Sequence, residues 1–229
     1  MNELFDLVQE NIKSAQIEIE EAISKSGRQV QDVSVMAVTK THPVSYMQAA
    51  LSAGLIHLGE NRISEGGRKI KELGSEKAIF HAIGVLHRKE VRQATRDFHY
   101  LDAIHNIRII DELARRKVNN KILLEINTSG EPAKQGFAPD LGLLEETVNR
   151  VIEFDLNLEG FLTVGPLGQG EAVQRKAFSS LREIRDNLEK KCGIQLPVLS
   201  MGMSDDFTLA VLEGSTVVRL GRRLFGTRK

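Results

Sequence analysis

The sequence predicts a parallel (β/α)₈ barrel that forms a single domain over residues 1–229. Eight short apolar segments recur along the chain, and a segment of helical character separates each one from the next. This alternation is typical of right-handed βαβ units whose strands share one parallel sheet. Eight units in 229 residues match a closed barrel near its lower size limit, and an open doubly wound sheet is the alternative.

A long amphipathic helix is predicted ahead of the barrel. Its apolar side chains fall on one helical face, and Gly27 follows as a stop signal. They are Leu4, Val8, Ile12, Ala15, Ile19, Ala22 and Ile23. Because the last predicted strand has almost no helix behind it, we expect the helix in residues 1–27 to pack on that side of the barrel.

Short apolar runs predict the eight strands, because a strand covered by helices is apolar on both faces. They are residues 33–38, 56–59, 78–83, 100–104, 121–126, 158–164, 197–200 and 216–220. The segments between them predict helices, two of which end at Gly54 and Gly74. These helices are residues 44–53, 63–73, 88–97, 107–117, 141–154, 171–191 and 205–213.

Composition excludes several classes of protein. The 31 basic and 31 acidic residues balance, so nothing in the net charge indicates nucleic acid or an anionic membrane. One cysteine, Cys192, excludes an internal disulfide and fits a reducing cytoplasm. No apolar stretch reaches the length of a membrane span, and the six histidines lack metal-binding spacing. With no apolar stripe left over, we expect a cytoplasmic monomer without a metal.

Lys40 and Arg219 are the most conspicuous charged candidates. Lys40 ends the first predicted strand, in which five of the six residues 33–38 are apolar. A lysine at the mouth of a buried strand is either paired or used as an amine nucleophile toward a carbonyl, and an ordinary strand-end lysine is the alternative. Arg219 ends the last predicted strand, which becomes a neighbour of the first when a barrel closes.

Small and polar residues follow the other predicted strands, at the end where barrels carry their active sites. They include Glu60, Asn61, Gly84, His105, Asn106, Asn127, Ser129, Thr163, Gly165, Ser200 and Gly202. Strand-to-helix turns use the same residue types for turns and caps, and that explanation stays open for each of these positions.

Two segments are predicted to bind a phosphate. Residues 200–206 place Gly202 and Ser204 just before a predicted helix, where free N–H groups favour an anion. Residues 214–221 end the eighth strand with Gly221, which Arg222 follows. Barrels commonly bind phosphate in the loops after strands seven and eight. Against this, Ser204 has the position of a simple helix cap, and two aspartates beside it would repel a phosphate that they faced.

Motifs of a known family extend from the N-terminal helix to the C-terminus. They are residues 37–40 (Ala-Val-Thr-Lys), 59–61 (Gly-Glu-Asn), 81–84 (His-Ala-Ile-Gly), 199–206, 214–221 and 225–226. The Ser-Met-Gly-Met-Ser-x-Asp and Gly-Ser-Thr-x-Val-Arg-x-Gly pair is the most specific part. On these motifs the sequence resembles the pyridoxal 5′-phosphate (PLP) homeostasis proteins, which have the barrel of the alanine-racemase N-terminal domain (PLP fold type III).

The resemblance assigns cofactor-binding roles by position. It implies that Lys40 forms the internal aldimine with PLP and that Arg219 faces the pyridine nitrogen. It further implies a phosphate cradle formed by Ser204 and the backbone around Gly221 and Arg222. The remaining implied residues, near the ring and in the pocket wall, are Asn61, Ser200 and Met201. Lys134 matches another family lysine. The sequence departs from the family at Arg62, where an aromatic residue is usual, and at residues 87–90.

The implied function is a non-catalytic PLP carrier that buffers or delivers the cofactor, with PLP-dependent apo-enzymes as candidate recipients. Arginine opposite the ring nitrogen cannot accept its proton, so the ring stays a weak electron sink. Racemisation also needs a second acid/base, which alanine racemase supplies as a tyrosine with the help of a second domain. Here the chain ends at Lys229, and its tyrosines are Tyr46 and Tyr100. A weak PLP-dependent amino-acid racemase is the alternative, and an RNA- or protein-binding module using the basic residues 88–96 is a third hypothesis.

Overall fold

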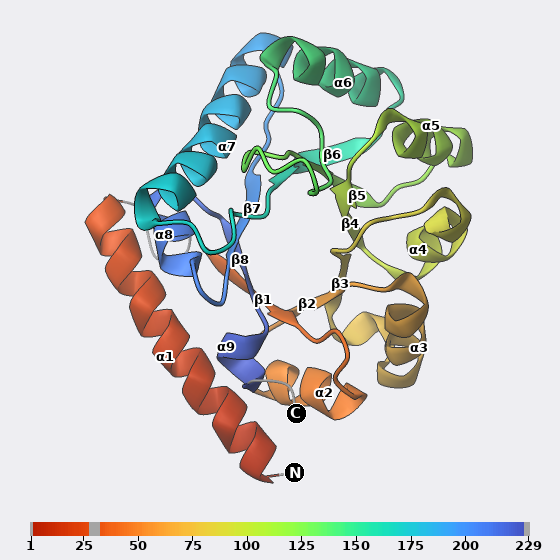
Figure 1. Cartoon of the computed structure of the whole chain (residues 1–229). Coiled ribbons are helices and arrows are strands. Elements are labelled where there is room, and N and C mark those ends of the chain that lie inside the picture. The colour runs from red at the N-terminus through yellow and green to blue at the C-terminus, as the bar shows by residue number, and fades with distance from the viewer. Residues whose placement is uncertain (1, 28–32, 227–229) are drawn as a thin grey trace.

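Eight parallel strands form a closed barrel in chain order, and β1 pairs with β8 to complete the ring (Figure 1). The computed structural model describes residues 2–27 and 33–226. The strands are β1 (Ser34–Val38), β2 (His57–Glu60), β3 (Ile79–Ala82), β4 (Tyr100–Ile104), β5 (Lys121–Glu125), β6 (Asn157–Leu162), β7 (Val198–Met203) and β8 (Val217–Leu220). The predicted barrel is therefore confirmed, and the open doubly wound sheet is wrong.

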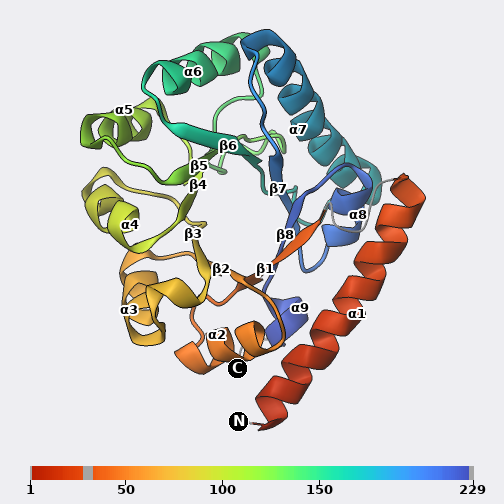
Figure 2. The same cartoon turned by 180° about the vertical axis from the view of Figure 1, so that it is seen from behind.

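Helices alternate with the strands and surround the barrel (Figure 2). They are α2 (Val44–Ser52), α3 (Ile63–Leu73), α4 (Val91–Asp97), α5 (Ile107–Arg116), α6 (Leu141–Glu153), α7 (Glu171–Cys192), α8 (Phe207–Leu212) and α9 (Arg222–Phe225), with 3₁₀ turns η2 (Ser75–Lys77) and η3 (Arg88–Glu90). Within the described ranges, none of the helices combines the length and apolar character needed to cross a membrane.

The N-terminal helix α1 (Asn2–Ser26) packs against α2, α8 and α9. Its apolar face, including Val8, Ile12 and Ile23, is buried in the main hydrophobic core. Asn11 donates a hydrogen bond to the carbonyl of Leu224 at 2.9 Å, which fixes α1 to the last helix. This helix covers the side of the barrel where β8 is followed only by the short α9.

Strand alternation separates the core into an outer and an inner set of side chains. Because successive strand residues point to opposite faces, one set meets the helices and the other fills the barrel. The outer set is apolar and includes Leu58, Phe80 and Phe161, all fully buried. The inner set carries several polar groups, among them Asp102 and Arg219, both buried. The barrel interior therefore combines apolar packing with buried charged groups.

Most predicted boundaries are correct to within two residues, but the seventh strand ends later than predicted. It continues past Ser200 to Met203, with a register shift against β8 between these residues. Gly202 lies in this irregular stretch with φ of +93°, and a Cβ there would come within 2.6 Å of the Ala210 Cβ. The glycine is needed for both reasons, and it disguises the end of the strand in the sequence.

Two predicted helices differ from the structure at their starts. The helix predicted for residues 88–97 is a 3₁₀ turn followed by α4 from Val91, and a capping box between His87 and Glu90 marks the turn. The helix predicted for residues 205–213 begins only at Phe207, because Asp206 occupies the N-cap position. The segment after β8 forms the additional short helix α9.

Candidate functional site

A cavity of about 360 Å³ opens at the C-terminal ends of β1, β7 and β8, and we call it the C-terminal cavity. Its lining consists of Val38, Lys40, Ile83, Pro166, Leu167, Gly168, Gln174, Met203, Ser204, Asp205, Asp206, Arg219, Gly221 and Arg222. The structure thus brings together five of the eight predicted cofactor residues. These are Lys40, Ser204, Arg219, Gly221 and Arg222.

A buried hydrogen-bond network fixes the residue before Lys40. The Thr39 hydroxyl donates to Glu60 Oε1 at 2.6 Å, and Lys69 Nζ donates to the Thr39 carbonyl at 2.9 Å. Lys69 also forms an ion pair with Glu60 at 3.0 Å. Burial raises the pKa of Glu60, while the hydrogen bonds from Thr39 and Lys69 oppose that shift. The strand end that carries Lys40 is therefore anchored to α3.

The residue after Lys40 is tied to the same network. Thr41 has a left-handed backbone, with φ of +67°, and its N–H donates to Glu65 Oε1 at 2.6 Å. Glu65 is also paired with Lys69 at 2.6 Å. A non-glycine residue in this region is strained and persists only where neighbouring contacts hold it. Both neighbours of Lys40 are thus fixed, which defines where its amine enters the cavity.

Arg219 is a buried cation that neutral acceptors hold. Its guanidinium donates to the Ser200 carbonyl at 2.6 Å, to Ser200 Oγ at 2.9 Å and to the Thr163 carbonyl at 2.8 Å. Burial lowers the pKa of Arg219, and the negative charges of Asp102, Asp206 and Glu125 oppose this. These contacts fix the guanidinium plane at the floor of the C-terminal cavity.

Ser204 caps a different helix from the one that the sequence indicated. Its Oγ accepts a hydrogen bond from the Arg223 N–H at 3.1 Å, in the first turn of α9. The interpretation of Ser204 as a cap of residues 205–213 is therefore wrong, because that helix starts two residues later, at Phe207, with Asp206 as its N-cap. The hydroxyl joins the β7 end to the first turn of α9, directly after the second predicted phosphate segment.

Both aspartates of the predicted phosphate segment line the cavity, and each is engaged. Asp205 forms an ion pair with Arg222 at the exposed rim. Asp206 is buried, and its Oδ1 accepts the Met203 N–H at 2.6 Å. Burial raises the pKa of Asp206, and hydrogen bonding and the charge of Arg219 oppose this shift. The repulsion expected toward an anion is reduced by these partners.

The other three predicted cofactor residues do not line the C-terminal cavity. Ser200 is fully buried beneath Arg219 and supports it. Met201 is fully buried in the main hydrophobic core. Asn61 is exposed, and its backbone carbonyl lies against Gly84, where a Cβ would approach to 2.0 Å. Their direct contact with a cofactor stays a prediction. Arg62, the family departure beside Asn61, is also exposed and lies outside the cavity lining.

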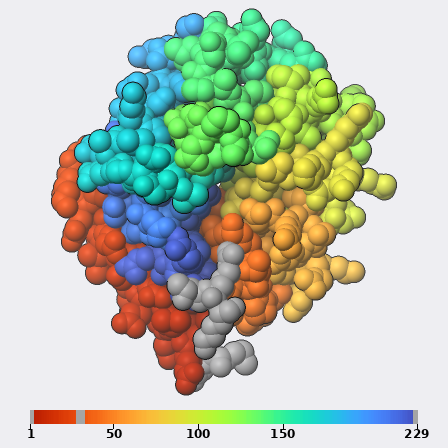
Figure 3. All heavy atoms as spheres, viewed as in Figure 1, coloured from red at the N-terminus to blue at the C-terminus, as the bar shows by residue number. Residues whose placement is uncertain are grey.

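One wall of the cavity comes from the segment after β6, which the sequence did not identify as functional. It contributes Pro166, Leu167, Gly168 and, from α7, Gln174. The glycines of residues 165–170 were the available signal, but they match no known phosphate or dinucleotide motif. Figure 3 shows this segment (cyan) beside the loop after β5 (green) on the same face of the molecule.

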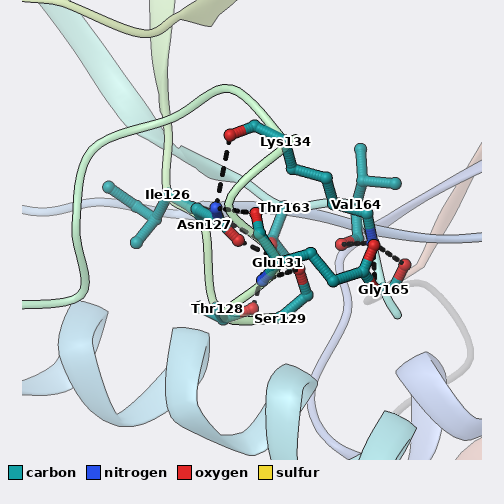
Figure 4. A network of polar contacts seen from close by, with 9 residues as sticks. All are labelled: Ile126, Asn127, Thr128, Ser129, Glu131, Lys134, Thr163, Val164 and Gly165. Atoms are coloured by element: carbon teal, nitrogen blue, oxygen red, sulfur yellow. Dashed lines mark hydrogen bonds and ion pairs between the residues drawn. The ribbon is translucent and has the colours of Figure 1, made fainter. Parts of the chain in front are cut away.

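Lys134 connects these two loops (Figure 4). Its Nζ donates to the Gly165 carbonyl at 2.7 Å and pairs with Glu131 at 3.1 Å. Asn127 donates to the Glu131 carbonyl at 2.9 Å, which closes the loop around the lysine. Because Gly165 directly precedes residues 166–168, Lys134 supports the cavity wall. In the described chain, no cluster of histidine, cysteine and acidic residues has the arrangement of a metal site.

Comparisons with known proteins place this geometry in a family. None of the protein-family models matches the chain. The pyridoxal phosphate homeostasis protein of Pseudomonas aeruginosa is 34% identical over 226 residues, which cover 96% of either chain. That of Aquifex aeolicus is 32% identical over 220 residues, covering 92% of this chain and 94% of the relative. The chain belongs to the pyridoxal phosphate homeostasis protein family.

Solved structures agree with this family membership. PipY of Synechococcus elongatus, solved with PLP bound, is 28% identical and has a TM-score of 0.78, covering 91% of this family member and 100% of PipY. An alanine racemase of Clostridium difficile is 16% identical with a TM-score of 0.74, covering 97% of this chain and 57% of the racemase. The racemase shares the fold alone. The predicted resemblance and the alanine-racemase type of barrel are both confirmed.

Proposed function

We propose that this family member binds PLP in the C-terminal cavity, holds it through an imine link to Lys40 and acts as a carrier rather than as a catalyst. The observation that carries the proposal is the meeting of Lys40, Arg219, Ser204 and Gly221 in one cavity of about 360 Å³. The names of the curated relatives and the PLP-bound structure of PipY support it.

The cavity offers a complementary group for each part of PLP. Lys40 would hold PLP through its aldehyde, with which a lysine amine can condense with release of one water molecule. The Ser204 hydroxyl accepts from Arg223 and keeps its own proton for a phosphate oxygen. The backbone after Gly221 and the positive charge of Arg222 complete this phosphate end. Arg219, at the cavity floor, remains for the ring nitrogen.

The residues around the ring favour holding PLP over using it. Bound PLP supplies an aldehyde and a ring that withdraws electrons most strongly when its nitrogen is protonated. A carboxylate beside that nitrogen would keep it protonated. Arg219 has donors only and cannot accept this proton. The chain therefore places a group there that binds the ring without activating it.

A second acid/base for racemisation has no evident source in the C-terminal cavity. The chain has two tyrosines. Tyr46 lies on α2 and stacks on His42, which precedes that helix. Tyr100 begins β4 at the opposite end of the barrel. Asp205 and Asp206 line the cavity but are occupied by Arg222 and the Met203 N–H. Proton exchange at the α-carbon of amino acids tests the racemase alternative, and turnover of about 1 s⁻¹ or more would overturn the carrier proposal.

The same proposal includes a cytoplasmic monomer in one domain that passes PLP to apo-enzymes. The single cysteine suits a reducing compartment. The basic residues of the third hypothesis are partly neutralised, because Arg88 pairs with Glu112 and Arg96 with Asp97. Transfer is measured by mixing the loaded protein with an apo-enzyme that depends on PLP and following the recovery of that enzyme's activity.

Replacement of Lys40 by alanine tests the covalent link. We expect the purified or reconstituted wild-type protein to show a visible imine band that borohydride removes, because reduction converts the imine to a secondary amine. Peptide mass spectrometry should then find the pyridoxyl group on Lys40. Lys40→Ala should lack both signals, whereas the exposed-lysine control Lys176→Ala should keep them. An unchanged band in Lys40→Ala would refute the proposal.

A further inference from the structure

A second cavity lies at the opposite end of the barrel interior, and we call it the N-terminal cavity. It has a volume of about 240 Å³, and the first residues of several strands line it, including Ser34, His57 and Tyr100. Asp102 and Ser200 reach it from deeper in the barrel. The function proposed above makes no use of its titratable groups.

Three of these groups form a chain of hydrogen bonds. His57 Nδ1 lies 2.9 Å from His81 Nε2. His81 Nδ1 lies 3.0 Å from Asp102 Oδ2 and 3.2 Å from Oδ1. Asp102 is 0% and His81 3% exposed, while His57 is half-buried. We call His57, His81 and Asp102 the relay.

For a neutral His81, counting protons gives the direction of the relay. A carboxylate only accepts, so His81 Nδ1 must carry the proton that Asp102 receives. In a neutral His81 the Nε2 atom is then an acceptor, and His57 must donate to it from Nδ1. Burial and the neighbouring His81 lower the pKa of His57 to about 4. With both histidines neutral and Asp102 ionised, the relay carries one negative charge, located on Asp102.

Asp102 is electrostatically connected to Arg219. Ser200 lines the N-terminal cavity together with Asp102, and its hydroxyl accepts from Arg219 at 2.9 Å. Within the described chain, the hydrogen-bond acceptors of the Arg219 guanidinium are neutral. Three negative charges favour the protonated form of Arg219: Asp102 contributes most, followed by Asp206 and Glu125. Burial raises the pKa of both Asp206 and Glu125, so they hold negative charge less readily.

We propose that Asp102, His81 and His57 are positioning residues that fix one negative charge below Arg219 and so hold its guanidinium in place for the ring nitrogen of the ligand. This inference rests on the proposed function, since it assigns Arg219 to that nitrogen. It predicts that the N-terminal end of the barrel controls ligand retention at the C-terminal end through Arg219, without touching the ligand.

Nitrogen NMR of the ligand-free protein tests the relay itself. Long-range ¹H–¹⁵N spectra identify which ring nitrogen of each histidine is protonated. We expect His57 and His81 both to carry the proton on Nδ1 near neutral pH. A proton on Nε2 of His81, or a charged His81, would overturn the inference, because the hydrogen-bond chain would then run differently.

A ligand pair tests the action on Arg219. One ligand is PLP, and the other is its analogue with carbon in place of the ring nitrogen. We expect Asp102→Asn to weaken retention of PLP about tenfold, because a charge that supports the guanidinium is lost. Retention of the carbon analogue should change less than about twofold, since that ring makes no bond to Arg219. Equal losses for both ligands indicate general disruption and would overturn the inference, as would no loss for either.

Variants of the half-buried His57 keep the test decisive if Asp102→Asn does not fold. Glutamine can donate to His81 as His57 does, so His57→Gln should retain PLP like the wild type. Phenylalanine cannot donate, so His57→Phe should lose PLP selectively relative to the analogue. The surface control His87→Gln should match the wild type. Equal behaviour of His57→Gln and His57→Phe would contradict the inference, whereas a wild type without an imine would refute the proposed function instead.

Discussion

Lys69 and Arg219 are the buried cations of the described chain, each 5% exposed, and their partners differ. Lys69 on α3 forms ion pairs with Glu60 at 3.0 Å and Glu65 at 2.6 Å. Arg219 on β8 donates to neutral oxygens of Ser200 and Thr163. One cation is neutralised by direct contact, and the other depends on carboxylates that lie farther away.

The difference separates structure from function. A buried charge without a close counter-ion is unfavourable, so it persists where something else uses it. Lys69 lies outside the C-terminal cavity and secures the strand end of Lys40. Arg219 lines that cavity, and its positive charge is available to a ligand. The two cations thus serve the same cavity, Lys69 by fixing the backbone beside Lys40 and Arg219 by lining the cavity itself.

Removing the neutralised cation should have the largest effect. We expect Lys69→Met to lower the free energy of unfolding by about 3–5 kcal/mol, because Glu60 is left buried without its charged partner. Urea denaturation measures the change. Adding Glu60→Gln should restore part of the loss, since the unpaired charge is removed. If Lys69→Met alone were as stable as the wild type, the network of Lys69, Glu60 and Thr39 would not anchor the strand end.

Removing the other cation should act mainly on the ligand. We expect Arg219→Leu to weaken retention of PLP by about 1–3 kcal/mol, because the ring nitrogen loses its hydrogen-bond donor. Equilibrium dialysis measures the dissociation constant. Lys69→Met serves as the control at a temperature where it is folded, and its retention should fall less than that of Arg219→Leu. If Arg219→Leu retained PLP as well as the wild type does, Arg219 would not contribute to PLP binding.

Acidification should destabilise the protein through His57. The pKa of His57 is lowered from 6.5 to about 4, and the groups facing it are His81, Asp102 and Lys121. The unfolded chain binds a proton between these two values and the folded protein does not, so stability is complete above pH 6.5 and falls toward pH 4. After a discount for partial exposure, we expect a loss of about 1–2 kcal/mol. Urea denaturation across this range should show a smaller loss in His57→Gln, and identical pH profiles would contradict the assignment.

The smallest expected effect concerns the contact between Ser204 and the first turn of α9. Ser204→Ala removes the acceptor of the Arg223 N–H and the hydroxyl offered to a phosphate. We expect a decrease of about 1 kcal/mol in both unfolding free energy and PLP retention. Thermal unfolding and dialysis measure the two quantities. Ser179→Ala, at a serine that bonds only within its own helix, is the matched control and should leave retention unchanged.

Part of the candidate site was predictable because its residues lie at the C-terminal ends of predicted strands. Lys40 and Arg219 each close a short apolar run, and parallel strands place their C-terminal ends at one mouth of a barrel. Ser200 and Met201 were less predictable. A strand has a period of two residues, so their assignment to the inside or the outside depends on the register of β7. The register shift at Gly202 is a property of the closed sheet and leaves no local pattern.

The amino-acid sequence by itself determined the order of strands and helices, the number of eight strand–helix units and the position of Lys40, since these depend on local periodicity and on residues at strand ends. Only the tertiary structure decided that the barrel closes, that Ser204 bonds to α9, that Lys69 anchors the strand of Lys40 and that Ser200 accepts a hydrogen bond from Arg219. Those contacts join residues of different elements, and their geometry is fixed only when the barrel has closed.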